Sequence, residues 1–510
     1  MVELIVIEVM KHRVDWNNIC LTAKKNIHQD VEAGNLNLAL KKIRSVLNIE
    51  INSSIYRDDE LESILLKMSD ILFPEECLFH PIQGNYVFCD SMMWDDHGLT
   101  QQYLSAIMNM GVNILYIKTE LSDHPSEEIQ SMLDKYEKAS VIKISKDTDF
   151  VKSIQLIYNS IVEYRPEKIF IHSFSCLDVV VLNKIASSIR YRINLGSHLT
   201  WVGINCTDIM LEFDDFGYTV SLEKRCFPKN KMFKLPFYPV LDSHCFEGFD
   251  FPLQEGAVLM FTGGASYKIK DKNDTFLNII KKLIENNNSL IVLIALRDNN
   301  EYVSKFILKN NLYGRLINLS YRKDINQVFK HIDIFLQTYP TVGGLMLKYA
   351  MLNRKPVLSF VLKESFESYS KIDDKPVDFG DRTYRLAYTN LEEFHEEAKK
   401  LIEDRVYRES IGNVLGDCAL DELKFNDEFK RIILGDSELN FKFSKLSLDY
   451  DVLDKRFSDS EETRESIYFA TLLRSYGLNF LFLFYPLFLF RFNDVLNTIW
   501  RYLKNKYVLG

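Results

Sequence analysis

The sequence predicts an α/β protein with two doubly wound, Rossmann-like domains, a helical segment before them and an apolar helical tail after them. Short apolar runs alternate with amphipathic stretches in two separate series, and a turn-rich segment divides the two. The chain has 510 residues, of which 47% are hydrophobic and 26% charged, which is enough for two large cores. This composition excludes a disordered or fibrous protein.

The first predicted segment, residues 1–80, is helical from residue 12 to about 75. Leu36, Leu40 and Ile43 share one helical face, and another helix follows the acidic start at Asp58. We interpret this segment as a small helical cap.

Two predicted domains follow, residues 81–240 and 257–435, joined by a linker at 241–256. The turn residues Gly248, Pro252 and Gly256 indicate the linker. Alternating strands and helices imply parallel sheets with right-handed crossovers. Because such sheets bind ligands at the carboxyl ends of their strands, we expect the active site in a cleft between the domains. The predicted strands are 86–89, 113–117, 141–144, 168–172, 209–213, 257–262, 290–296, 316–319, 332–337 and 356–360.

The net charge and the cysteine pattern indicate which partners and which cellular compartment to expect for this protein. The net charge of −9 would repel a polyanion, which argues against nucleic acid as a partner. The eight cysteines form no CxxC pair, which is typical of reduced thiols rather than of disulfides or a zinc site. The apolar start of the chain carries two acidic residues and no basic region, so we do not interpret it as a signal peptide. We expect a cytoplasmic protein.

The most informative motif is the strand that runs through Pro340 and Thr341 into Gly343 and Gly344, which open a helix. Glycines without Cβ let a ligand approach the backbone, and the amino end of a helix favours an anion. The motif therefore predicts a diphosphate site, with Thr341 either capping the helix or donating its hydroxyl to a phosphate. Alternatively, the paired glycines serve packing alone.

Two further loops of the second domain offer phosphate-binding chemistry. Gly263, Gly264 and Lys268 follow its first strand. Arg322 and Lys323 follow a later strand, where they either contact a nucleotide or form a solvated basic pair. Together the three loops favour a nucleoside diphosphate ligand.

The first domain offers candidates for a general base on the acceptor side. Asp95, Asp96 and His97 follow its first strand, and Gly98 permits the tight turn before a helix. Asp96 or His97 is the predicted base, unless Asp96 caps the helix and His97 is solvated.

A second imidazole of the first domain, His198, lies near Trp201, which we assign to the acceptor side. His198 is the other candidate base, or else a structural residue.

Four sequence blocks resemble bacterial GT-B glycosyltransferases that build surface polysaccharide, such as capsule, O-antigen or lipopolysaccharide. The blocks are 90–103, 198–203, 261–268 and 339–349, and the resemblance covers roughly residues 85–430. It implies that the second domain binds a nucleotide-sugar donor and the first domain a glycan acceptor, without an obligatory metal or any cofactor. His97 stands where the resemblance leads us to expect an arginine, and Gly196 and Ser197 where we expect an acidic residue. No Glu-x7-Glu pair is well placed, which favours inversion over retention.

The C-terminal extension, 436–510, ends in an apolar, phenylalanine-rich run at 478–490 and a basic, aromatic stretch at 491–510. The run is too short to span a bilayer, which needs roughly 20 apolar residues. Its pattern is typical of an interfacial helix on anionic lipid, so we predict peripheral attachment to the inner face of the cytoplasmic membrane and a lipid-linked acceptor. Alternatively, the tail packs back on the protein.

Two other functions fit the same architecture. One is a nucleotide-sugar epimerase, which would have little use for an aromatic tail. The other is a non-catalytic glycan-binding or scaffold protein.

Overall fold

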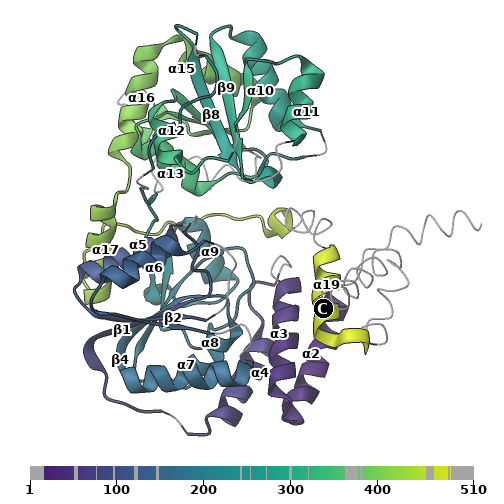
Figure 1. Cartoon of the computed structure of the whole chain (residues 1–510), viewed down its shortest axis with the longest axis vertical. Coiled ribbons are helices and arrows are strands. Elements are labelled where there is room, and N and C mark those ends of the chain that lie inside the picture. The colour runs from purple at the N-terminus through teal and green to yellow at the C-terminus, as the bar shows by residue number, and fades with distance from the viewer. Residues whose placement is uncertain are drawn as a thin grey trace, which may run out of the picture. The chain divides into compact units, whose positions relative to one another are not determined.

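A computed structural model describes most of the chain as two compact units (Figure 1). Unit 1 comprises Met1–Thr100, Ile107–Lys234 and Ser447–Gly510, and unit 2 comprises Gln101–Ala106 and Leu235–Leu446. The described residues are 16–50, 55–75, 77–95, 98–119, 125–144, 149–241, 244–252, 254–271, 273–297, 301–319, 321–361, 377–378, 383–454, 465–479 and 483. The predicted apolar run and basic stretch of the tail lie almost wholly outside these residues.

Unit 1 contains a sheet of seven parallel strands in the order β3-β2-β1-β4-β5-β6-β7. Its strands are β1 (Ile82–Asp90), β2 (Asn113–Lys118), β3 (Ala139–Lys143), β4 (Pro166–His172), β5 (Ile189–Ile193), β6 (Ile209–Glu212) and β7 (Met232–Lys234). Its connecting helices are α5 (Leu99–Asn109), α6 (Glu127–Lys135), α7 (Phe150–Tyr164), α8 (Cys176–Leu182) and α9 (Asp215–Glu223). The five strands predicted for this domain are confirmed, with small shifts at their ends.

Strands β5 and β7 were not predicted from the sequence. In β5, Arg190 and Arg192 interrupt the apolar pattern that a buried strand normally shows. The structure satisfies both guanidinium groups: Arg190 pairs with Asp208, and Arg192 donates to the carbonyls of Ser173 and Val202. Burial of these charges therefore depends on partners that the local sequence does not reveal.

Helices from both ends of the chain pack together in unit 1. They are α2 (Trp16–Glu32), α3 (Leu36–Glu50), α4 (Asp59–Leu72) and α19 (Glu465–Tyr476), and Figure 1 shows α19 beside α2 and α3. Trp16 meets Tyr468 edge-on at 5.0 Å, and Ser45 hydrogen-bonds Ser475. Asp58 caps α4 by accepting from the Leu61 N–H at 2.9 Å, as the acidic start predicted.

Unit 2 contains a sheet of six parallel strands in the order β10-β9-β8-β11-β12-β15. Its strands are β8 (Val258–Gly264), β9 (Leu290–Leu296), β10 (Leu316–Leu319), β11 (Ile334–Leu336), β12 (Val357–Phe360) and β15 (Ala387–Tyr388). Its helices are α10 (Thr275–Asn286), α11 (Glu301–Asn310), α12 (Ile325–Lys330), α13 (Gly344–Leu352), α15 (Leu391–Glu403), α16 (Arg405–Asp417) and α17 (Glu422–Leu434). The five strands predicted for this domain are confirmed, whereas β15 and the short antiparallel pair β13 (Val377–Asp378) and β14 (Thr383–Tyr384) were not predicted.

Candidate functional site

Each sheet reverses its strand order at one place. In unit 1 the order runs outward from β1 to β3 and then resumes on the other side with β4, and in unit 2 the same reversal separates β8 from β11. Doubly wound sheets bind ligands at the carboxyl ends of the strands beside such a switch point. The two switch points therefore mark where functional residues should be sought.

In unit 2, the two glycines that end β8 have different reasons for being glycine. A Cβ on Gly263 would lie 2.8 Å from the carbonyl oxygen of Ala295 on β9, so this glycine is required by strand packing. Gly264 adopts a φ of 148°, which L side chains rarely adopt. We predicted that both glycines bind the ligand, but the close contact of Gly263 is with the protein itself.

The turn after β11 is held by side chains of the strand end. Gln337 Nε2 donates to the Gly343 carbonyl at 3.1 Å, and Thr338 Oγ1 donates to the Thr341 carbonyl at 2.6 Å. Gly343 is the residue that precedes α13, and among the described residues no side-chain hydrogen bond caps this helix. Thr341 is therefore not the cap, and the Gly343 N–H donates to Gln337 Oε1 at 3.4 Å rather than standing bare.

Lys268 brings a positive charge to the same turn. It ends the 3-10 helix η3 (Ser266–Lys268), and its carbonyl accepts from the Thr341 N–H at 3.3 Å. Its Nζ would lie 3.1 Å from a Cβ built on Gly343. Burial lowers the pKa of Lys268, and no carboxylate of the described residues neutralises it. The structure thus brings Lys268, Thr341, Gly343 and Gly264 together at the switch point of unit 2.

Arg322 lies in a different environment from the one we predicted. It is 8% exposed and donates to both carboxylate oxygens of Asp324, at 2.7 and 2.6 Å. A third donor bonds the Gly248 carbonyl at 2.7 Å, and Asp324 accepts from the Glu247 N–H at 2.8 Å. Arg322 and Asp324 therefore fasten segment 244–252 to unit 2, whereas the neighbouring Lys323 is exposed.

In unit 1, Asp90 and His172 end β1 and β4 and are partners across the strand pair. His172 Nδ1 lies 3.0 Å from Asp90 Oδ1, and the two side chains are 2% and 0% exposed. Although burial by itself would raise it, the pKa of Asp90 is held below its usual range by His172 and two hydroxyl donors. The other donors to Asp90 are Thr100 Oγ1 at 2.8 Å, the Tyr116 hydroxyl at 2.7 Å, and the N–H groups of Met92 at 2.7 Å and Met93 at 3.1 Å.

The pairing of these two residues was not predicted from the sequence. Asp90 and His172 lie 82 positions apart. The signal in the sequence was that Asp90 directly follows one predicted apolar strand and His172 ends another.

The loop after β1 is described in part. Asp96 and His97, the predicted bases, lie outside the described residues. Asp95 accepts from the N–H groups of Glu128 and Ile129, both at 3.1 Å, so it stabilises the first turn of α6. Gly98 has a φ of 68° directly before α5, which is the tight turn that we predicted.

The segment around His198 is anchored by a buried arginine. Arg225 Nη2 donates to the carbonyls of Ser197 at 2.8 Å and Leu199 at 2.7 Å, on either side of the half-buried His198. Trp201 is 4% exposed, with the guanidinium groups of Arg192 and Arg225 at 4.3 and 5.1 Å from its ring. The contacts of Trp201 are thus with the interior of unit 1.

The buried carboxyl group of Glu212 is linked to Arg225 through the hydroxyl of Ser221. Glu212 ends β6, is 0% exposed, and accepts from Ser221 Oγ at 2.6 Å and Asn194 Nδ2 at 2.8 Å. Burial raises the pKa of Glu212 to about 7, and burial lowers the pKa of Arg225 to about 10. Glu212 is therefore an acid of near-neutral pKa that supports the loop carrying His198.

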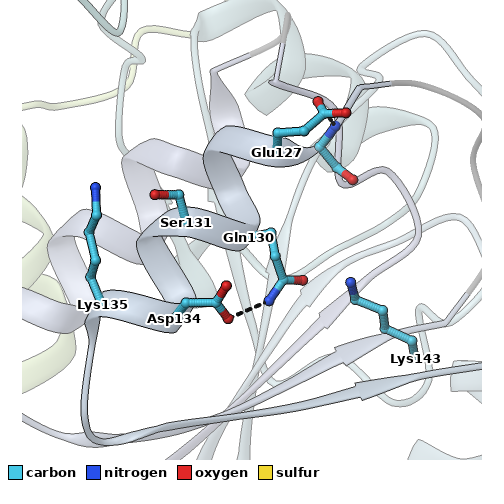
Figure 2. A pocket seen from close by; sticks show the side chains of 7 residues that line it. Glu127, Gln130, Ser131, Asp134, Lys135 and Lys143 are labelled. Carbon is cyan, nitrogen blue, oxygen red and sulfur yellow. Dashed lines mark hydrogen bonds between the residues drawn. The ribbon is translucent and has the colours of Figure 1, made fainter.

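A pocket on the outer edge of the first sheet contains none of the predicted site residues. Figure 2 shows it between α6 and β3, an edge strand, with Gln130 donating to Asp134 at 2.7 Å. It is lined by Ser126, Glu127, Gln130, Ser131, Asp134, Lys135 and Lys143.

Neither a group of metal-ligating side chains nor a membrane-spanning helix occurs among the described residues. No three histidine, cysteine, aspartate or glutamate side chains in the described ranges are grouped so that they could hold a metal ion. Among the helices that the structure describes, none is both long and apolar enough to cross a membrane.

Comparison with known proteins identifies the fold. No protein-family model and no curated protein matches the chain. A glycosyltransferase from Rickettsia africae ESF-5 is 13% identical, with 69% of this chain and 99% of that protein covered and a TM-score of 0.50. TarM of S. aureus is 9% identical, with 70% of this chain and 100% of TarM covered and a TM-score of 0.50. The chain has the GT-B fold. This fold confirms the two Rossmann-like domains that the sequence predicted, since each unit contains one parallel sheet of that type.

Proposed function

We propose that the chain is a glycosyltransferase that moves a sugar from a nucleoside diphosphate sugar to a glycan acceptor. The observation that carries this proposal is the ammonium group of Lys268, which lies beside the Gly343–Gly344 turn at the switch point of unit 2. Lys268 is half-buried, and a partly desolvated cation without a carboxylate partner among the described residues is unfavourable. An anionic ligand at this turn would offset that cost.

A diphosphate fits the turn in charge and in hydrogen-bonding geometry. The first-turn N–H groups of α13 are not capped by a side chain, and the amino end of a helix attracts an anion. Lys268, Gly344 and the Thr341 hydroxyl would stabilise the negative charge that develops on the departing diphosphate. Gly264 would allow the ligand to approach the end of β8 closely.

The fold supports this proposal without determining it, because one fold serves several activities. TarM and the Rickettsia glycosyltransferase share the architecture. The four sequence blocks that resemble surface-polysaccharide enzymes point the same way.

The finer assignments extend the proposal. The reaction inverts the anomeric centre and needs neither metal nor cofactor, and Asp96, His97 or His198 is the base assigned from the sequence. The acceptor is a lipid-linked glycan of surface polysaccharide. The aromatic, basic tail holds the enzyme on the inner face of the cytoplasmic membrane, where such an acceptor is found.

A binding screen tests the donor assignment. Uridine, guanosine and cytidine diphosphates and their sugars are titrated calorimetrically into the wild type and into Lys268→Met, with Lys305→Met on the exposed side of α11 as the exposed-lysine control. We expect one nucleotide to bind the wild type and the control equally and Lys268→Met about 10-fold or more weakly, since a hydrogen bond to a charged group contributes roughly 1.5–3 kcal/mol.

The products distinguish the three functions. Transfer to a glycan, or slow hydrolysis of the nucleotide sugar, supports the glycosyltransferase. Release of an isomerised nucleotide sugar would identify an epimerase. Failure of every nucleotide to bind the wild type would overturn the proposal and favour a non-catalytic glycan-binding protein.

A further inference from the structure

We propose that the pocket between α6 and β3, the α6–β3 pocket, binds an uncharged stretch of the glycan acceptor. The inference rests on the proposed function for the identity of the glycan, and it deepens that function by adding a binding site on unit 1 away from the reacting sugar. Three features carry it: the shape and lining of the pocket, the amide of Gln130, and the connection of α6 to the loop after β1.

The α6–β3 pocket follows one face of a helix. Four of its lining residues are spaced three or four positions apart on α6: Glu127, Gln130, Ser131 and Asp134. Side chains at this spacing lie next to one another along the helix. Lys143, the last residue of the edge strand β3, lines the pocket from the sheet (Figure 2). The cavity has a volume of about 480 Å³, within the roughly 300–1,000 Å³ of small-molecule sites, so it has room for a short run of sugar rings.

The lining of the pocket is polar throughout. Its charges are the carboxylates of Glu127 and Asp134 and the ammonium groups of Lys135 and Lys143, and none of them is in an ion pair with another described residue. An apolar ligand would find no apolar side chain to pack on, and a polyphosphate would meet as many negative charges as positive ones. A sugar hydroxyl both donates and accepts hydrogen bonds, so it can use carboxylate, ammonium and serine hydroxyl groups alike. The lining therefore favours an uncharged, hydroxyl-rich ligand.

The amide of Gln130 is already oriented for such a ligand. Its Nε2 donates to Asp134 Oδ1 at 2.7 Å, so the amide oxygen points the other way, toward Lys143 (Figure 2). That oxygen, Oε1, is shielded from solvent and accepts no hydrogen bond from any described residue, although Gln130 lines the pocket. A buried acceptor without a donor is unfavourable. A sugar hydroxyl that enters the pocket and donates to Oε1 would remove this cost.

The first turn of α6 is tied to the loop that follows β1. Asp95 of this loop accepts from the N–H groups of Glu128 and Ile129, both at 3.1 Å. Its own N–H donates to the Pro125 carbonyl at 3.0 Å, and the pocket begins at the next residue, Ser126. We predicted from the sequence that this loop lies on the acceptor side, so a glycan whose reacting end lies at the loop would continue into the pocket. The α6–β3 pocket therefore holds the part of the acceptor behind the reacting sugar.

A glycan array tests the class of ligand. The labelled full-length protein is applied to printed bacterial oligosaccharides, both uncharged and anionic, beside its Gln130→Leu and Lys143→Met variants. We expect the wild type to bind at least one uncharged oligosaccharide and both variants to give a signal lower by about 10-fold or more, because each loses a hydrogen-bonding group of the pocket. Binding to anionic glycans alone would overturn the uncharged ligand, and binding to no glycan would overturn the site.

Two controls separate the pocket from a general loss of binding. Lys152→Met removes an exposed lysine from α7, outside the pocket, and should bind as the wild type does. Leucine is a good helix former, so Gln130→Leu should keep the wild-type melting temperature, and the exposed position of Lys143→Met covers the case in which it does not fold. Undiminished binding by the folded pocket variants would place the glycan elsewhere on the chain and overturn the inference.

Transfer kinetics distinguish this inference from the proposed function. With the bound glycan as acceptor, Gln130→Leu should raise the KM for the acceptor by about 10-fold, while kcat and the Kd of the nucleotide stay at the wild-type values because the donor turn belongs to unit 2. An unchanged KM would refute the role of the pocket in holding the acceptor and leave the glycosyltransferase standing. A wild type that binds the glycan but neither binds nor consumes a nucleotide sugar would instead refute the proposed function and leave the pocket as a glycan-binding site.

Discussion

Lys268 Nζ faces Gly343 so closely that a Cβ on this glycine would lie 3.1 Å from it. The two residues come from different strand ends, β8 and β11, which are neighbours in the sheet. This contact links the glycine turn to a positive charge, so the proposed anion site can be tested by a change of a single residue.

Gly343→Asp should place a carboxylate in the proposed anion site. The φ of Gly343 is −118°, which any residue adopts, and an aspartate there would place its carboxylate against Lys268. The internal ion pair would compete with the diphosphate, so we expect the preferred nucleotide to bind about 10-fold or more weakly, while the fold is kept. Calorimetric titration measures the affinity, with Gly343→Ala as control. Equal affinity in the aspartate variant and the wild type would remove the diphosphate assignment.

Gly263→Ala should act on stability instead. Its Cβ would lie 2.8 Å from the Ala295 carbonyl, and main-chain atoms of a paired strand cannot move away cheaply. We expect the free energy of unfolding to fall by about 1–3 kcal/mol, as for other overpacked cores. Urea denaturation measures this change against Gly343→Ala, whose contact is the flexible end of a lysine. An unaltered free energy of unfolding would show that β8 and β9 adjust to the methyl group.

Arg322→Met separates the predicted nucleotide role from the observed structural one. The change leaves Asp324 buried without its partner, which costs about 3–5 kcal/mol when one member of a buried pair is removed. We expect a lower melting temperature and an unchanged nucleotide Kd for the folded protein. Lys323→Met, one position away and exposed, serves as control and should alter neither. Loss of nucleotide binding without loss of stability would restore the role predicted from the sequence.

Glu212→Gln should change how stability depends on pH. The ordinary pKa of 4.5 is raised to about 7 in the folded protein, so the folded state binds this proton more tightly than the unfolded state. Proton binding by Glu212 therefore adds to the free energy of unfolding. This contribution is complete below pH 4.5 and is lost as pH rises through 7. Denaturation of both proteins between pH 5 and 8 should show the wild type losing stability relative to the glutamine variant as pH rises. Parallel pH profiles would mean that Glu212 is ionised in the folded state.

Most of the fold could be predicted from the sequence because alternation is a local signal. Apolar runs such as Leu290–Leu296 are buried throughout, and their spacing between amphipathic helices implies parallel strands. The turn at Gly98 and the glycine start of α13 were also readable, since a positive φ or a missing side chain is a property of one position. Strand β5 could not be predicted from the sequence, because its two arginines are hydrogen-bonded to residues that lie outside the strand.

The sequence by itself determined the two Rossmann-like sheets and the glycine start of α13, on which the prediction of an anion site rests. Only the tertiary structure decided which side chains meet: Arg322 with Asp324 and segment 244–252, Trp201 with two guanidinium groups, and Asp90 with His172. The physical reason is that strand order brings together positions far apart in sequence. Which residue pairs with a buried charge therefore depends on the strand order, and not on the residues next to that charge in the sequence.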